Sequence, residues 1–93
     1  MSELKKAVIS VLGKDQKGII AKVTNELYEC SVNVLDISQT SLDGKFTMVM
    51  AVDAANANVG FEELAAQLRE LGEGMELSIR IQREEIFDAM HRI

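Results

Sequence analysis

The chain has 93 residues, of which 47% are hydrophobic and 27% charged, and its formal net charge is −5. These values are typical of one small globular domain and argue against a disordered chain. An acidic chain without a basic stripe is not suited to bind nucleic acid, so we expect no nucleic-acid partner. No apolar run is long enough to span a bilayer, so we expect no membrane partner either.

The first six residues lack the apolar core of a secretion signal, which favours a cytoplasmic protein. Cys30 is the single cysteine, so no internal disulfide is expected. One cysteine and one histidine, His91, cannot form a structural zinc site by themselves, and we expect no metal or cofactor. The helical phase of Cys30 predicts a buried, unreactive thiol, and His91 is expected to be exposed.

The first predicted strand covers roughly residues 6–12 and leads through a glycine turn into a helix that starts at Gln16 or Gly18 and ends at Glu29. The first N–H groups of a helix lack partners, so such a turn tends to bind a carboxylate. Asp15 is expected to cap the helix, and Gly18 leaves room for a ligand or a second subunit. The same pattern also fits an ordinary connecting loop without a ligand.

The second predicted strand, residues 32–42, changes its apolar phase near Leu35 and Asp36, which predicts either a β-bulge or a strand covered on both faces. Its second half is polar, as is typical of a sheet edge, and this strand is the candidate dimer seam. Asp43 and Gly44 then predict a hairpin turn into a third strand over residues 45–53. The first and third strands carry apolar residues at both parities, which predicts that both faces are covered at least in part.

A second amphipathic helix is predicted after Asn58, which is expected to cap it, and Gly72 and Gly74 are expected to end it. The fourth strand, residues 75–82, alternates regularly between apolar and polar side chains. Residues 83–93 predict a short helix that packs on the second sheet face, on a partner subunit, or on both.

The order βαββαβ predicts an α+β ferredoxin-like sandwich, here with an added C-terminal helix. This fold hosts many functions, so particular residues must decide. The loop after the first strand has no arginine for an acylphosphatase-like site, Cys30 cannot form a copper-chaperone pair, and Phe46 alone is weak support for RNA binding.

Two motifs, residues 14–20 (Lys-Asp-Gln-Lys-Gly-Ile-Ile) and residues 32–37 (Val-Asn-Val-Leu-Asp-Ile), resemble the signature of ACT domains. The resemblance covers residues 6–82, and residues 1–93 as a whole resemble a family of small stand-alone ACT proteins of unassigned function. A single ACT-like domain is therefore expected, with its core at residues 6–82 and its C-terminal helix at 83–93. The family's common proline before the loop glycine is Lys17 here.

The resemblance implies a non-enzymatic regulator that binds a small molecule, usually an amino acid, between two subunits of a homodimer. Carried over by position, the ligand-binding residues would be Asp15, Gly18, Ile19, Ile20, Asn33, Val34 and Asp36, and no residue would be catalytic. With no catalytic domain attached, any regulated enzyme or regulator would be a separate protein. The alternatives are an interaction module without a ligand and, third, a phosphatase-like enzyme.

Overall fold

The computed structural model describes residues 5–90. Its elements in chain order are β1 (Lys6–Lys14), α1 (Ile19–Glu29), β2 (Asn33–Leu42), β3 (Lys45–Asp53), α2 (Phe61–Gly74), β4 (Leu77–Arg83) and α3 (Glu84–Met90). The four strands form one sheet in the order β2-β3-β1-β4, with antiparallel neighbours throughout. The predicted ferredoxin-like βαββαβ fold with a C-terminal helix is confirmed. No helix in the described chain is long and apolar enough to cross a membrane.

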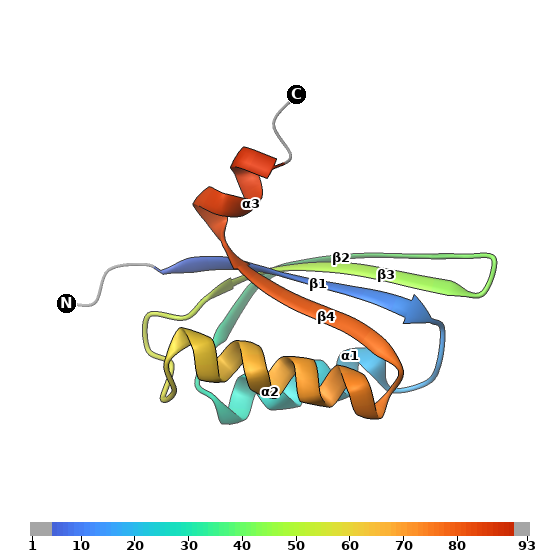
Figure 1. Cartoon of the computed structure of the whole chain (residues 1–93), viewed down its shortest axis with the longest axis horizontal. Helices are drawn as coiled ribbons and strands as arrows, with labels where there is room; N and C mark the ends of the chain where they lie inside the picture. The colour runs from blue at the N-terminus through green and yellow to red at the C-terminus, as the bar shows by residue number, and fades with distance from the viewer. Residues whose placement is uncertain (1–4, 91–93) are drawn as a thin grey trace.

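The core lies between one face of the sheet and the two long helices, α1 and α2 (Figure 1). Period-two alternation supplies the sheet side of this core, and an apolar stripe on each helix supplies the other. The side chains that are fully buried include Ile9, Val11, Val23, Leu27, Met48, Met50, Val52, Leu64 and Leu68. The methionines of β3 therefore fill the core, as their phase predicted.

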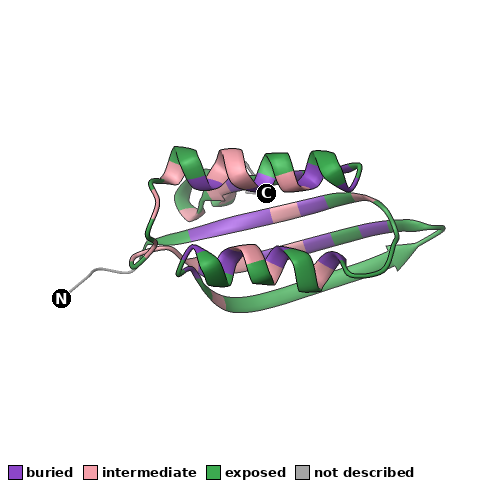
Figure 2. Cartoon of the chain, turned by 90° about the horizontal axis from the view of Figure 1, so that it is seen from below, coloured by how far each residue is buried: buried purple, intermediate pink, exposed green. Residues whose placement is uncertain are grey.

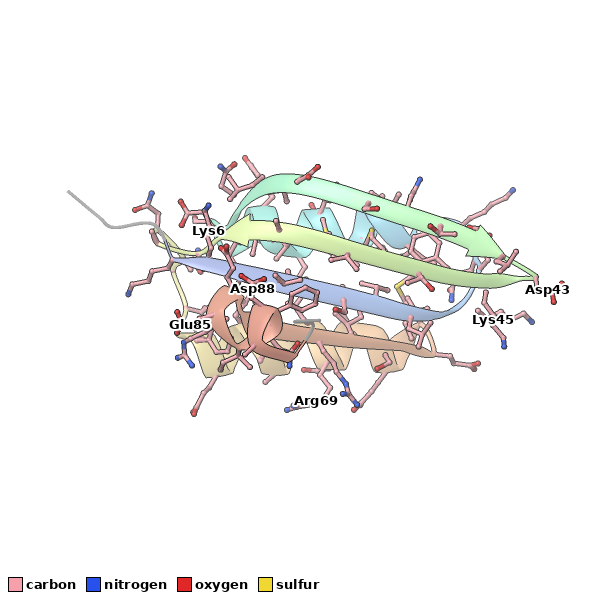
Figure 3. All side chains as sticks on the ribbon, turned by 90° about the horizontal axis from the view of Figure 1, so that it is seen from above. Lys6, Asp43, Lys45, Arg69, Glu85 and Asp88 are labelled. Carbon is pink, nitrogen blue, oxygen red and sulfur yellow. The ribbon has the colours of Figure 1, made fainter. Side chains whose placement is uncertain are left out.

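Helix α3 lies on the opposite side of the sheet from α1 and α2, where it contacts β1 and β4 (Figure 1). The prediction that the tail packs on the second face is confirmed for Glu84–Met90, while His91 and Ile93 lie outside the described residues. The prediction that β1 and β3 are covered on both faces at least in part is confirmed for β1, on which α3 packs, whereas α3 makes no contact with β3 within residues 5–90. Seen from above, α3 stands over one end of this outer face, far from the hairpin at Asp43 (Figure 3). Leu12, at the other end of β1, is 55% exposed.

Strand β2 is an edge strand, as its polar second half predicted. Its register against β3 shifts between Val34 and Asp36, which confirms the predicted bulge and leaves Leu35 unpaired. The bulge keeps Val34 and Ile37 on the helix side of the sheet, opposite the buried Val52 and Met50. The change of apolar phase in the sequence therefore reflects one inserted residue, not a second covered face.

The hairpin between β2 and β3 turns at Asp43 and Gly44, whose φ angles of 58° and 78° are both positive. This is the conformation that the dipeptide predicted.

Glycine has a different role at the end of α2. Gly72 is buried within the helix, where an added Cβ would lie 2.7 Å from the carbonyl oxygen of Leu77. The helix ends at Gly74, as predicted, but Gly72 does not end it and instead allows α2 to approach β4 closely.

Two predicted helix caps are also wrong. Helix α1 begins at Ile19 with Gly18 as its N-cap and no side-chain cap, so Asp15 does not cap it. Asn58 does not cap α2, whose N-cap is Gly60. The Asn58 amide instead donates to the carbonyl oxygen of Glu29 at 2.9 Å, and its backbone N–H donates to that of Cys30. Asn58 therefore ties the connector before α2 to the C-terminal end of α1.

Asp53 ends β3 and accepts two backbone hydrogen bonds, from Lys5 and Ala55, each at 3.0 Å. These two N–H donors lower the pKa of the Asp53 carboxyl below its ordinary value of 3.8. A lowered pKa in the folded state contributes stability that is present above pH 3.8 and is lost as the pH falls through the folded-state value.

We therefore expect Asp53→Asn to be less stable than the natural protein at neutral pH, because an amide oxygen accepts these bonds more weakly than a carboxylate. The difference should shrink as the pH falls below about 4. Urea unfolding at a series of pH values measures it, with Asp43→Asn in the exposed hairpin turn as the control. A difference that stays constant down to pH 2 would contradict the assigned pKa direction.

Candidate ligand-binding loop and sheet edge

The loop between β1 and α1 combines an anchored start with an open helix N-terminus. The Asp15 N–H donates to the carbonyl oxygen of Gly44 at 2.8 Å, so the loop is held against the hairpin turn. The Gln16 amide donates to the carbonyl oxygen of Met75 at 2.8 Å, which ties the loop to the end of α2. Gly18 has a φ of 84°, and an added Cβ there would meet nothing within 4 Å. The surface at Gly18 is therefore accessible to another molecule.

The N-terminus of α1 keeps its partial positive charge. Its first α-helical hydrogen bond runs from the N–H of Lys22 to the carbonyl oxygen of Gly18, so the preceding N–H groups have no partner within the helix. No acidic side chain lies in its first turn, in contrast to α2, which carries Glu62 and Glu63 there. Nothing in the first turn of α1 therefore offsets its attraction for a carboxylate.

The predicted loop residues differ in what they can offer a ligand. Asp15 and Gly18 are exposed, and Ile20 is half-buried. Ile19 is only 2% exposed and belongs to the hydrophobic core, so its backbone N–H, not its side chain, is the group that could face a ligand.

The predicted strand residues surround the bulge of β2. Val34 packs against the core on the helix side of the sheet. Asn33 and Asp36 are exposed and pair with Asp53 and Ala51, so their side chains point to the outer face. The Asp36 carboxylate also accepts the N–H of Ile37 at 2.9 Å. The bulge therefore brings the amide of Asn33 and the carboxylate of Asp36 to one side of the strand.

Within one chain the two halves of the predicted site are far apart. Lys14, next to the loop, lies in register with Lys45 and Leu42, whereas Asn33 lies in register with Asp53 and Lys6 at the other end of the sheet. The nine residues from Lys6 to Lys14 span about 26 Å of strand. A site made of both halves therefore requires a second chain.

The free edge beside β2 carries exposed apolar side chains. Leu35, Ile37 and Leu42 on β2 are 45%, 39% and 74% exposed, and Tyr28 on α1 is 81% exposed. Viewed from below, β2 runs as an exposed strand along one edge, next to α1 (Figure 2). Isolated exposed apolar residues are ordinary, but several along one free strand edge make that edge a candidate contact surface.

Tyr28 is a part of this surface that the sequence reasoning missed. At 3.6 residues per turn, Ile20, Thr24 and Tyr28 share one flank of α1. The opposite flank faces α2, because the Cys30 thiol donates to the Gln67 amide oxygen at 3.2 Å. Tyr28 therefore points away from α2, towards the β2 edge. The sequence signal for this placement was the four-residue spacing between Thr24 and Tyr28, which puts the two side chains on one flank of a helix.

Cys30 is buried, as its phase predicted. Burial, followed by the neighbouring Glu26, raises the pKa of the thiol above its ordinary value of 9.0, so the thiolate is disfavoured at neutral pH. Among the described residues, no group of three or more His, Cys, Asp or Glu side chains is arranged to hold a metal ion.

The comparisons with known proteins agree with this fold. The model of the ACT domain family matches residues 5–82, a range that ends before α3. A UPF0237 protein of Bifidobacterium longum is 52% identical over 97% of this chain and 100% of its own length. A UPF0237 protein from Listeria monocytogenes is 48% identical over 95% of this chain and 99% of its own length. The solved structure of an ACT domain protein from Streptococcus pneumoniae matches with a TM-score of 0.79 and 38% identity, covering 96% of this chain and 100% of that one.

Proposed function

This chain belongs to the ACT domain family, whose members are typically regulatory ligand-binding domains, and on that premise we propose that it is a non-enzymatic regulator that binds an amino acid between two copies of itself. The observation that carries the proposal is the open N-terminus of α1 at Gly18, beside a sheet edge that has no partner in one chain.

The proposed dimer pairs the β2 edges of two copies in antiparallel fashion about a two-fold axis. Because β2 then runs opposite to its copy, Asn33 of one chain comes next to Leu42 of the other. Leu42 lies in register with Lys45, next to the hairpin turn at Gly44. The carbonyl oxygen of Gly44 accepts the N–H of Asp15 and so holds the loop at this end of the sheet. The pairing thus brings the two halves of the site, which one chain keeps apart, to the same end of the joint sheet.

The chemistry of the two halves suits an amino acid. The free N–H groups at Gly18, Ile19 and Ile20 face a carboxylate, which the uncompensated helix N-terminus favours. The Asn33 amide and the Asp36 carboxylate of the second copy supply acceptors for the ammonium group. The Val34 side chain packs against the core on the other face of the strand, so Val34 can offer only its backbone to this ligand. The proposed partner is an enzyme or regulator that the chain controls in trans.

Isothermal titration calorimetry of the full chain against a panel of free amino acids tests this function. We expect at least one to bind saturably, and Gly18→Leu to weaken its binding at least about tenfold, because the new side chain covers the loop amides. A residue other than glycine at φ 84° costs about 1–2 kcal/mol, so the variant should remain folded.

The control is Gly74→Leu at the end of the other long helix, where φ is not positive and nothing lies within 4 Å of an added Cβ. It should leave amino-acid binding unchanged. Absence of heat and of a thermal shift with every amino acid would overturn the proposal and would favour an interaction module without a ligand.

A further inference from the structure

A cleft lies at the end of the sheet opposite the Gly18 loop. It has a volume of about 450 Å³, within the range of small-molecule sites. Three segments far apart in sequence meet around it. They are the start of β1, the connector between β3 and α2, and the junction of β4 with α3. Its lining consists of Lys5, Lys6, Ala7, Ala54, Ala55, Ala57, Val59, Gly60, Phe61, Leu64, Arg83 and Glu85.

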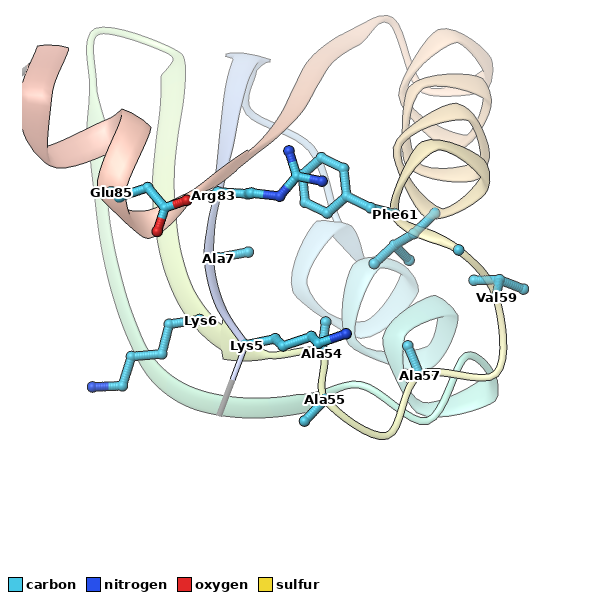
Figure 4. A pocket seen from close by; sticks show the side chains of 12 residues that line it. Lys5, Lys6, Ala7, Ala54, Ala55, Ala57, Val59, Phe61, Arg83 and Glu85 are labelled. Carbon is cyan, nitrogen blue, oxygen red and sulfur yellow. The ribbon is translucent and has the colours of Figure 1, made fainter. Parts of the chain in front are cut away.

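The lining is cationic although the protein is acidic. Three of its side chains, Lys5, Lys6 and Arg83, are cations, whereas Glu85 is the single anion among them. Lys5 and Arg83 border the opening from opposite sides, and Lys6 turns away from it (Figure 4). On a chain of net charge −5, this cleft is a local concentration of positive charge that attracts anions.

An aromatic ring holds the head group of Arg83, whereas Lys5 is held through its backbone. The Arg83 guanidinium stacks over the Phe61 ring, 4.5 Å from its centroid. Lys5 is fixed by its backbone, whose N–H donates to Asp53 and whose carbonyl oxygen accepts from Ala54. Neither of these contacts occupies the N–H donors of the Arg83 guanidinium or the ammonium group of Lys5. Their charges therefore remain available to a ligand, and stacking holds the Arg83 donors ready for a planar or tetrahedral anion.

The rest of the cleft is apolar. Small side chains, Ala7, Ala54 and Ala57, leave the space open, and Phe61 with Val59 forms one wall. We propose that this cleft binds a small organic anion, with its carboxylate or phosphate group between Lys5 and Arg83 and its apolar body against Phe61 and the alanines. The site is separate from the Gly18 loop and lies entirely within one chain.

Amide NMR of the ¹⁵N-labelled full chain, titrated with benzoate, phenyl phosphate or the neutral benzamide, tests the proposal. The two anions should produce saturable shifts confined to residues 5–7, 54–61 and 83–85, and benzamide should bind at least about tenfold more weakly. Tighter binding of either anion supports the proposal and identifies the preferred head group. Equal binding of benzamide, or shifts elsewhere, would overturn it.

Arg83→Gln should weaken binding of the anions at least about tenfold, because it removes the charge but keeps a side chain of similar length. The matched control is Arg80→Gln, three residues away on the same strand and exposed on the outer face, which should leave the affinity unchanged.

If Arg83→Gln proves unstable, Lys5→Gln is the second variant, and it should likewise weaken binding of the anions at least about tenfold. Gly18→Leu should not alter this binding, so failure here is distinguishable from failure of the amino-acid site. Unchanged affinity in both Arg83→Gln and Lys5→Gln would refute the site.

Discussion

Replacing Ile37 by lysine is expected to convert the proposed dimer to monomers, weakening association at least about a hundredfold. Ile37 lies near the middle of β2, so antiparallel pairing of two β2 edges brings it close to the two-fold axis and to its own copy. Lysine there would place two like charges together in a contact that excludes water. In the monomer Ile37 is 39% exposed, so the lysine ammonium can reach solvent and the fold should persist.

Sedimentation equilibrium measures the change. Ser78→Lys is the control, since Ser78 is exposed on β4, the other edge strand of the same sheet. Ser78→Lys should leave the association constant of the dimer unchanged. If instead Ser78→Lys yields monomers while Ile37→Lys remains dimeric, the interface lies at β4 and the proposed site is wrong. Because the amino-acid site needs both copies, Ile37→Lys should also abolish amino-acid binding.

The second large effect concerns stability. Gly72→Ala is expected to lower the free energy of unfolding by about 1–3 kcal/mol. The new Cβ would lie 2.7 Å from the Leu77 carbonyl oxygen and 3.0 Å from the Ile79 side chain, so α2 must move away from β4. For a domain of this size, each 1 kcal/mol corresponds to about 4–8 °C in Tm.

Gly74→Ala is the matched control, two residues along the same helix. Nothing lies within 4 Å of an added Cβ at Gly74, and its φ is not positive. Alanine there should raise stability by about 0.4–1 kcal/mol, because it reduces the entropy of the unfolded chain. Thermal and urea unfolding of both variants measure the difference. Equal effects of the two substitutions would show that the α2–β4 contact is looser than the structure has it.

Much of the fold could be predicted from the sequence, because it depends on local patterns. Period-two alternation in β3 and β4, the positive-φ dipeptide Asp43-Gly44 and the shift in apolar phase near Leu35 each specify backbone geometry over a few residues. The polar half of β2 also indicated that this strand lies at an edge. Sequence patterns of this kind report which face of an element is buried, and they did so correctly for the core.

The predictions that failed concern contacts between distant segments. Asn58 was expected to cap the helix that follows it, but its amide reaches Glu29 at the end of α1. Gly72 was expected to end a helix, but it is needed for a close contact with β4. In both cases the residue type indicated a special role correctly, while the partner that decides the role lies elsewhere in the chain.

The sequence by itself determined the order of strands and helices along the chain, the core stripes and the family, because these follow from residues that are neighbours along the chain. It limited the phase change near Leu35 to two explanations, and the structure decided for the bulge. Only the tertiary structure decided that the Gly18 loop and Asn33 lie at opposite ends of the sheet, so that the proposed site needs a second copy. It also decided that Lys5 and Arg83 face each other across a cleft. The physical reason is that strand pairing brings together residues that are dozens of positions apart, and no local pattern encodes that distance.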